Sequence, residues 1–180
     1  MTRVYSIGHS NQPVEDFIAV LQRAGIKSVV DVRSQPVSRF SPQFNRKRLA
    51  DSLQRGGVSY LFLGEALGGR PSGREFYDAD SYVLYGRLAE TPEFRAGLDR
   101  LVTLAAAEPV AVMCAEEDPA ACHRRLLVGR ALADLGVSMF HLRRTGKMEA
   151  DETFGRSNQL SLDAGPEDWR SRRPVPRSRR

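Results

Sequence analysis

The chain has 180 residues, of which 41% are hydrophobic and 27% are charged, which is typical of one globular domain with a sizeable core. No apolar run approaches the roughly 20 residues that a membrane-spanning helix needs, and the N-terminus lacks the apolar stretch of a secretory signal, so we expect no membrane association. The two cysteines do not form a disulfide framework of the secreted type, and we therefore expect a cytoplasmic protein.

The net charge of +5 is concentrated in two regions. Residues 1–142 hold 17 basic and 16 acidic side chains, whereas residues 143–180 hold 10 and 6. Within the first part, residues 33–74 hold eight basic side chains against two acidic ones. Local positive charge favours an anionic partner, and we expect nucleic acid or a nucleotide to contact loop 33–48 and the basic C-terminal tail.

Five apolar runs rich in β-branched residues predict strands. They are VYSIG at 4–8, SVVDV at 28–32, VSYLFL at 58–63, PVAVMC at 109–114 and VSMFHL at 137–142. Because these runs are almost continuously apolar, both faces of their sheet should be covered, as in a parallel sheet between two helical layers.

Amphipathic patterns predict helices between most of the strands, at 13–24, 46–55, 81–89, 93–107 and 119–135. The order predicts an α/β fold with three layers (α/β/α) and a mostly parallel five-stranded sheet, with a helical insertion after the third strand. After residue 142 the pattern ends. We therefore expect a single α/β domain over 1–142 and a largely disordered basic tail over 143–180.

The helix predicted at 119–135 carries an arginine on its buried side. At 100° per residue, Arg124 shares an azimuth with the apolar stripe of Leu127, Val128, Ala131 and Leu135. A buried guanidinium needs a partner, which we expect to be a protein carboxylate or an anionic ligand. On the same helical wheel Cys122 should point away from the stripe.

The C-terminal ends of parallel strands lie at one edge of the sheet, where open α/β sheets bind ligands. All three histidines, both cysteines and several arginines follow the predicted strands and should gather there. Expected catalytic residues are His9, Asp31, Cys114, Glu116 and His123. Expected substrate or anion contacts are Ser10, Asn11, Arg33, Arg39, Arg70, Cys122 and Arg124.

Several of these residues have a purely structural alternative. Asp31 can cap a loop or pair with Arg124, His9 can cap a turn, and Arg33 and Arg39 can belong to a solvated basic loop. Cys114 is either a small buried apolar residue or a nucleophile activated by nearby positive charge.

We predict no metal, because C-x₇-C-H lacks the usual paired spacing of zinc ligands. Without a Walker A, GxGxxG or HExxH pattern, we also predict no cofactor.

Four ordered segments over about residues 3–142 resemble one family. They are SIGHSN at 6–11, VVDVRSQPVSRFSPQFN at 29–45, LGEALGGRP at 63–71 and MCAEEDPAACHR at 113–124, and together they resemble the domain-of-unknown-function family 488. The resemblance implies a compact α/β domain without an established cofactor. It also implies a polar site that contains His9, Asp31, Arg33, Glu116, Cys122, His123 and Arg124.

Two weaker similarities concern chemistry and partners. VVDVR and a cysteine after a later strand look like the rhodanese sulfurtransferases, but the three consecutive acids in AEEDPAACHR would repel an anion there. Residues 159–162 (QLSL) are similar to the start of a bacterial sliding-clamp-binding peptide, although the terminal aromatic residue is missing.

Three functions remain open on this basis. The first is an enzyme that binds or processes a phosphate-bearing substrate, nucleic acid or nucleotide. The second is a cysteine-dependent enzyme that acts on a small anionic or sulfur-bearing substrate, with Cys114 as nucleophile. The third is a non-catalytic binding module in which Arg124 and Asp31 form a structural ion pair.

Overall fold

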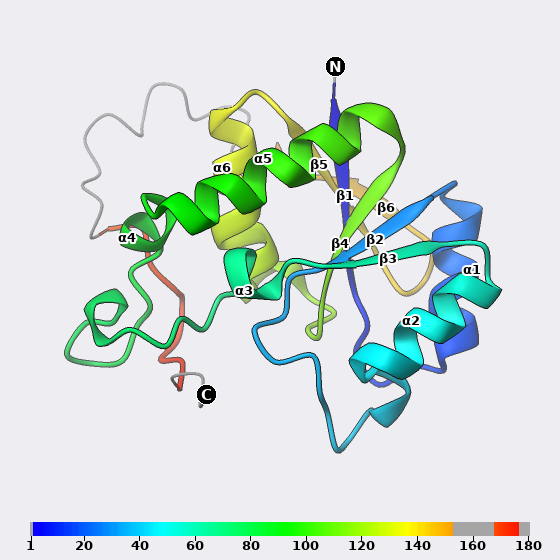
Figure 1. Ribbon diagram of the computed structural model, residues 1–180, viewed down its shortest axis with the longest axis horizontal. Coiled ribbons are helices and arrows are strands. Elements are labelled where there is room, and N and C mark those ends of the chain that lie inside the picture. Colours follow the sequence, from blue (N-terminus) through cyan, green and yellow to red (C-terminus); the bar gives the residue numbers. More distant parts are fainter. Residues whose placement is uncertain (1, 153–167, 177–180) are drawn as a thin grey trace.

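A computed structural model describes residues 2–152 and 168–176 of the chain (Figure 1). Its centre is a sheet with the strand order β3-β2-β4-β1-β5-β6. The strands are β1 (Arg3–Gly8), β2 (Ser28–Asp31), β3 (Ser59–Phe62), β4 (Val110–Cys114), β5 (Ser138–Leu142) and β6 (Met148–Ala150). The first five are parallel, as predicted, and β6 runs antiparallel to β5.

The sheet therefore has six strands within the described residues, and the prediction of five strands missed β6 at its edge. β6 follows β5 through a turn in which Gly146 has a φ of +84°, a conformation that glycine adopts without strain. Its short sequence, Met-Glu-Ala, has no run of β-branched residues that would have marked it as a strand.

Helices cover both faces of the sheet. The α-helices are α1 (Val14–Arg23), α2 (Arg46–Arg55), α3 (Gly64–Leu67), α4 (Tyr85–Ala89), α5 (Pro92–Ala107) and α6 (Arg130–Asp134). Short 3₁₀ turns are η1 (Pro42–Phe44), η2 (Arg74–Phe76) and η3 (Pro119–Ala121), and a π-helix, η4, spans Arg124–Gly129.

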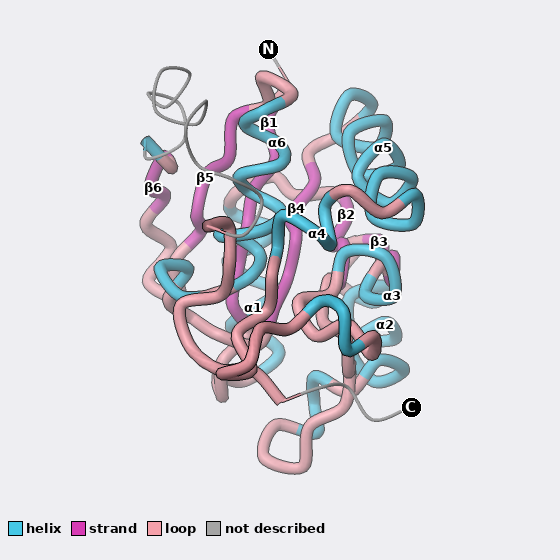
Figure 2. Tube along the Cα trace, turned by 90° about the vertical axis from the view of Figure 1, so that its left-hand side faces the viewer, coloured by secondary structure: helices cyan, strands magenta, loops and turns pink. Residues whose placement is uncertain are grey.

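Alternate residues of each central strand enter different cores. In β4, Ala111 and Met113 pack with α1 and α2, whereas Val110 and Val112 pack with α5 and α6 on the opposite face. Figure 1 shows the strands between these two pairs of helices, and Figure 2, turned by 90°, shows the strands side by side. The three-layer prediction is thus confirmed, and the apolar runs of the sequence follow from burial on both faces.

The helix predicted over 119–135 is wrong in detail. After η3 the chain is extended at Cys122, with φ −92° and ψ 140°, and helical geometry resumes only at His123. Asp118 accepts a hydrogen bond from the backbone N–H of Ala120, so Asp-Pro does begin a turn, but that turn lasts three residues. Azimuths counted from a continuous helix therefore do not apply to Cys122.

Two stretches beyond residue 142 have defined structure, within the tail that we expected to be largely disordered. One contains β6, and the other is 168–176. The indole N–H of Trp169 donates to the carbonyl of Leu126 at 2.6 Å, and Arg130 lies over the Trp169 ring at 4.5 Å. Backbone N–H groups of Ser171 and Val175 donate to Val83 and Ser81. An indole with a hydrogen-bond partner thus anchors a polar segment that lacks a core of its own.

The C-terminal end of β4 is the topological switch point of the sheet. The chain leaving β4 continues to η4 and α6 on one face, whereas the chains leaving its neighbours β1 and β2 continue to α1 and α2 on the other. Connections that diverge in this way leave a crevice above the strand, which is where such sheets bind ligands. None of the helices in the described residues has the length and apolarity that crossing a bilayer requires.

Candidate functional site

A pocket of about 560 Å³ lies at this switch point. Four separate segments and one tyrosine line it: 33–40 after β2, 69–70 after α3, 114–123 after β4, 171–176 near the C-terminus, and Tyr85. Its size is within the usual range for small-molecule sites.

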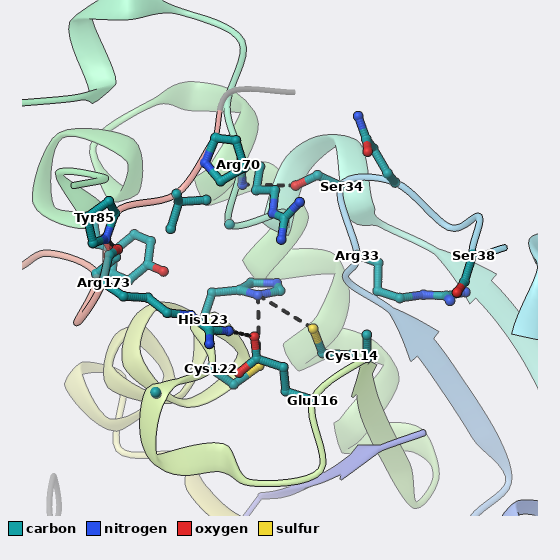
Figure 3. A pocket seen from close by; sticks show the side chains of 18 of the residues that line it. Arg33, Ser34, Ser38, Arg70, Tyr85, Cys114, Glu116, Cys122, His123 and Arg173 are labelled. Atoms are coloured by element: carbon teal, nitrogen blue, oxygen red, sulfur yellow. Dashed lines mark hydrogen bonds and ion pairs between the residues drawn. The ribbon is translucent and has the colours of Figure 1, made fainter. Parts of the chain in front are cut away.

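Cys114, Cys122 and His123 form one cluster in this pocket (Figure 3). The Sγ atom of Cys114 lies 3.7 Å from Nδ1 of His123, and the Sγ atom of Cys122 lies 4.0 Å from the same nitrogen. All three donor atoms lie within 4.8 Å of one another. Among the described residues this is the group of side chains that could hold a metal ion, although the ligand spacing in the sequence had led us to predict none.

The position of Cys122 corrects our expectation that it points away from the buried side. The extended backbone at Cys122 turns its side chain inward, and only 2% of the residue is exposed. The thiol thereby reaches Cys114, at the end of β4, across the loop that joins them.

The ring of His123 is fixed from two sides. Its Nε2 donates to the carbonyl oxygen of Val32 at 2.8 Å, so in the neutral imidazole Nδ1 carries the lone pair that faces the two thiols. Gly69 packs directly against the ring, because a Cβ atom at this position would lie 2.5 Å from Cβ and Cγ of His123. Any larger residue at 69 must displace the imidazole.

The three groups shift each other's protonation. A hydrogen bond from Cys122 holds the pKa of the Cys114 thiol well below its usual range, although burial opposes this effect, and His123 adds to it. Burial raises the pKa of Cys122 well above its usual range, and the hydrogen bond to Cys114 acts in the same direction. Burial, the largest single effect, lowers the pKa of His123, but the negative charge of Cys114 and the hydrogen bonds to Cys114 and Val32 together outweigh it and raise the pKa.

Arg124 is buried, with 1% of its surface exposed, but its partners within the described residues do not include the carboxylate that was one of the two expected alternatives. Its guanidinium donates to the backbone carbonyls of Glu116 and Glu117, and its Nε lies 3.4 Å from Oγ of Ser6. It does not line the pocket. Through these carbonyl oxygens Arg124 fixes the loop that follows β4. The same loop packs closely on Gly8, because a Cβ atom at residue 8 would overlap the carbonyl of Glu116.

A second polar network surrounds the end of β2. Asp31 pairs with Arg33 through contacts of 2.9 Å (Nε–Oδ1) and 2.6 Å (Nη2–Oδ2). The binding-module alternative required Asp31 to pair with Arg124, and the structure does not show that pair. Tyr60 donates to the same carboxylate at 2.7 Å. Burial raises the pKa of Tyr60, and the negative charge of Asp31 adds to the effect.

His9 belongs to this second network. Arg33 donates to its Nε2 at 3.1 Å, its Nδ1 donates to the carbonyl of Ser10 at 2.7 Å, and its ring stacks on Phe44. Both ring nitrogens are therefore used by a neutral imidazole. Burial lowers the pKa of His9, in agreement with this assignment, although the hydrogen bond to Ser10 acts in the opposite direction.

The structure divides the predicted site residues into two groups. Those that line the pocket are Arg33, Arg70, Cys114, Glu116, Cys122 and His123. Those that lie outside its lining are His9, Ser10, Asn11, Asp31, Arg39 and Arg124. His141, at the end of β5, also lies elsewhere and hydrogen-bonds Ser6 and Asp151.

Two of the lining residues that sequence reasoning missed bear on ligand binding. Arg173 lies in the segment that we expected to be disordered, and its guanidinium contacts the carboxylate of Glu116. Phe40 was read as part of a basic loop, but it lines the pocket with 94% of its surface exposed. Phe40 directly follows Arg39 in the sequence, but only the structure shows that it is exposed beside the pocket. The QLSL peptide at 159–162 lies outside the described residues.

The comparisons with known proteins identify the family and no closer relative. The family model described as "Domain of unknown function DUF488" matches residues 13–131, about two thirds of the chain. No curated protein and no solved structure matches the chain. The match confirms the resemblance carried by the ordered motifs, and the chain therefore belongs to the DUF488 family.

Proposed function

We propose that this protein is an enzyme that binds and processes a phosphate-bearing substrate of nucleotide type in the pocket at the end of β4. The observation that carries the proposal is the lining of that pocket: Arg70 and Arg173 come from two separate segments and line a space that also contains Cys114 and His123, while Arg33, held by Asp31, completes the lining. Guanidinium groups are suited to bidentate contacts with phosphate oxygens.

The arginines differ in how free they are to bind. Arg33 is held by Asp31, and Arg173 by Glu116 in a pair whose side chains are 58% and 36% exposed. An exposed ion pair contributes little, so an incoming anion can replace Glu116 at Arg173. Among the described residues no carboxylate pairs with Arg70, although its backbone N–H donates to Ser34 at 2.9 Å.

The exposed apolar residues of the pocket favour a ligand larger than a simple anion. Phe40 and Val37 line it with 94% and 69% of their surfaces exposed. Aromatic side chains next to positive charge are where nucleobases stack. A mononucleotide or the end of a single strand would place its base there and its phosphate near Arg70.

Binding of adenosine monophosphate, inorganic phosphate and a labelled oligonucleotide, measured by calorimetry or fluorescence, tests this assignment. We expect the mononucleotide to bind more tightly than phosphate. Arg70→Ala and Arg173→Ala should each weaken binding by at least about tenfold, because a hydrogen bond to a charged group contributes about 1.5–3 kcal/mol. Arg100→Ala, an exposed arginine on α5 outside the pocket, is the matched control. Equal affinities for all three variants would contradict the proposal.

A second candidate function is a cysteine-dependent enzyme that acts on a small anionic or sulfur-bearing substrate. The 3.7 Å contact between Cys114 and His123 favours it, because an imidazole at this distance can accept the proton of a nucleophilic thiol. In metal-free protein, iodoacetamide should then alkylate Cys114 faster than a free model thiol at neutral pH, and His123→Ala should remove the difference. Alkylation no faster than the model thiol would exclude this function.

A further inference from the structure

The second cysteine indicates how the Cys114–His123 pair is used. A thiol nucleophile and its base need one sulfur, yet Cys122 places a second sulfur at nearly the same distance from the same nitrogen. Three donor atoms around a common point, two of them thiols, are what a transition-metal site requires.

We propose that Cys114 Sγ, Cys122 Sγ and His123 Nδ1 bind one zinc ion. In a tetrahedral site, Zn–S bonds of about 2.3 Å and a Zn–N bond of about 2.0–2.1 Å place S and N about 3.6 Å apart and the two sulfurs about 3.8 Å apart. The S–N distances of 3.7 and 4.0 Å are close to this value. With every pair of donor atoms within 4.8 Å, the sulfurs need to approach each other by no more than about 1 Å.

The hydrogen bond on the other ring nitrogen of His123 is a second, independent observation in favour of a metal site. A histidine that binds a metal through one ring nitrogen almost always donates the other N–H to a carbonyl or carboxylate, which fixes the ring and its tautomer. His123 does this through Nε2 and the Val32 carbonyl at 2.8 Å, which leaves Nδ1 directed at both sulfurs.

The donors also lie on rigid parts of the fold. Cys114 is the last residue of β4, where its carbonyl accepts the backbone N–H of His9 at 2.9 Å. The loop that carries Cys122 is held by Arg124, and Gly69 packs against the His123 ring. Ligands fixed in this way pay little entropy when they bind an ion.

The donor set determines the type of ion and of site. Two thiols and an imidazole select zinc or another borderline-soft metal over magnesium or calcium, which prefer oxygen. Within residues 2–152 and 168–176 no histidine, cysteine or carboxylate joins these three residues as a fourth ligand. Here all three ligands line the pocket that contains the arginines, and three protein ligands with one open position are the arrangement of catalytic zinc sites. Water or a substrate oxygen would occupy that open position.

Metal binding to the full-length chain tests the site without any substrate, so its outcome is separate from that of the nucleotide experiment. The chain is stripped with a chelator, kept reduced, and titrated with Zn²⁺ against a chromophoric competitor and with Co²⁺ by absorption. We expect one ion per chain, and for Co²⁺ the thiolate charge-transfer and tetrahedral ligand-field bands.

Variants of the cluster sharpen this test. Cys122→Ser and His123→Ala should each lower the affinity for Zn²⁺ by about 100-fold or more, since each removes one of three protein ligands. Glu93→Gln, an exposed carboxylate on α5 outside the pocket, is the control and should change the affinity less than about threefold. Circular dichroism verifies that each variant is folded.

Protection of the wild-type thiols provides a measurement that needs no variant. Bound zinc should slow the alkylation of both Cys114 and Cys122. The proposal is overturned if the reduced chain binds no zinc, if Cys122→Ser binds it as tightly as wild type, or if zinc leaves the alkylation rates unchanged.

Discussion

The ends of β2 and β4 lie side by side in the sheet, yet their polar side chains are used in opposite ways. At β2, Asp31, Arg33, Tyr60 and His9 satisfy one another, and the carboxylate alone accepts from two side chains and a backbone N–H. At β4, the lone pair of His123 Nδ1 faces two thiols at 3.7 and 4.0 Å, next to a pocket.

This difference separates a structural network from a chemical one. Buried polar groups that have all their partners stabilise a fold and leave nothing for a ligand. Thiol and imidazole donor atoms that converge beside a pocket can instead exchange their mutual contacts for a metal or a ligand. We therefore expect substitutions at the end of β2 to affect mainly stability, and substitutions at the end of β4 to affect mainly ligand or metal binding.

The largest stability effect is expected for Asp31→Asn. It removes the charge that balances Arg33 in a pair whose side chains are 0% and 5% exposed. Breaking a buried pair by removing one partner costs about 3–5 kcal/mol. Urea unfolding of the metal-free variant measures this loss, and a change below about 1 kcal/mol would show that the network is not structural.

Gly69→Ala tests the support of the β4 cluster. Its new Cβ would meet the His123 side chain at 2.5 Å and displace the ring, which costs about 1–3 kcal/mol of stability as overpacking. Because ring orientation also determines where Nδ1 points, the affinity for Zn²⁺ should fall about 10- to 100-fold, the range seen when support around a metal ligand is removed. Competition titration measures the affinity, and unaltered binding would mean that the ring is not held from this side.

The pH dependence of the unfolding free energy should show that His9 is neutral in the folded protein. Burial keeps the pKa of His9 below its usual value of 6.5, so below pH 6.5 the unfolded chain takes up a proton that the folded protein does not. Stability should fall as the pH decreases below 6.5, by at most about 1.4 kcal/mol per pH unit from this group. Unfolding curves of wild type and His9→Asn between pH 7 and pH 5 measure the difference in slope. Equal slopes would contradict a neutral His9.

Tyr60→Phe should produce the smallest effect. It removes the hydrogen bond of 2.7 Å to Asp31, while Arg33 remains to satisfy the carboxylate. We expect a loss of about 1 kcal/mol in unfolding free energy and no change in zinc affinity. Measured together with Asp31→Asn, the variant shows whether the network is dominated by its ion pair, and a loss as large as that of Asp31→Asn would show that it is not.

The sequence predicted the sheet well because burial on both faces is recorded in each strand as a continuous apolar run. It also placed Cys114, His123, Arg33 and Arg70 at one edge, since residues after parallel strands must gather there. The family followed from ordered motifs, and the family match supports it.

The errors have a common physical origin in backbone geometry that side-chain patterns do not record. An extended residue between two helical turns brought Cys122 beside Cys114, which no helical wheel could show. Backbone carbonyls satisfied Arg124, and such partners are invisible in a list of side chains. Arg173 reaches the pocket because its segment is anchored by the indole of Trp169, which donates to Leu126, and by backbone hydrogen bonds to Val83 and Ser81.

The most direct test of the central claim is whether a bound mononucleotide protects Cys114 from alkylation by iodoacetamide. This measurement links the anion-binding part of the pocket to the cluster of Cys114, Cys122 and His123. In metal-free protein, adenosine monophosphate should slow alkylation of Cys114 at a concentration that matches its dissociation constant, and Arg70→Ala should shift that concentration at least about tenfold higher. A nucleotide that binds without protecting Cys114, or protection unaffected by Arg70→Ala, would show that the end of β4 is not the functional site.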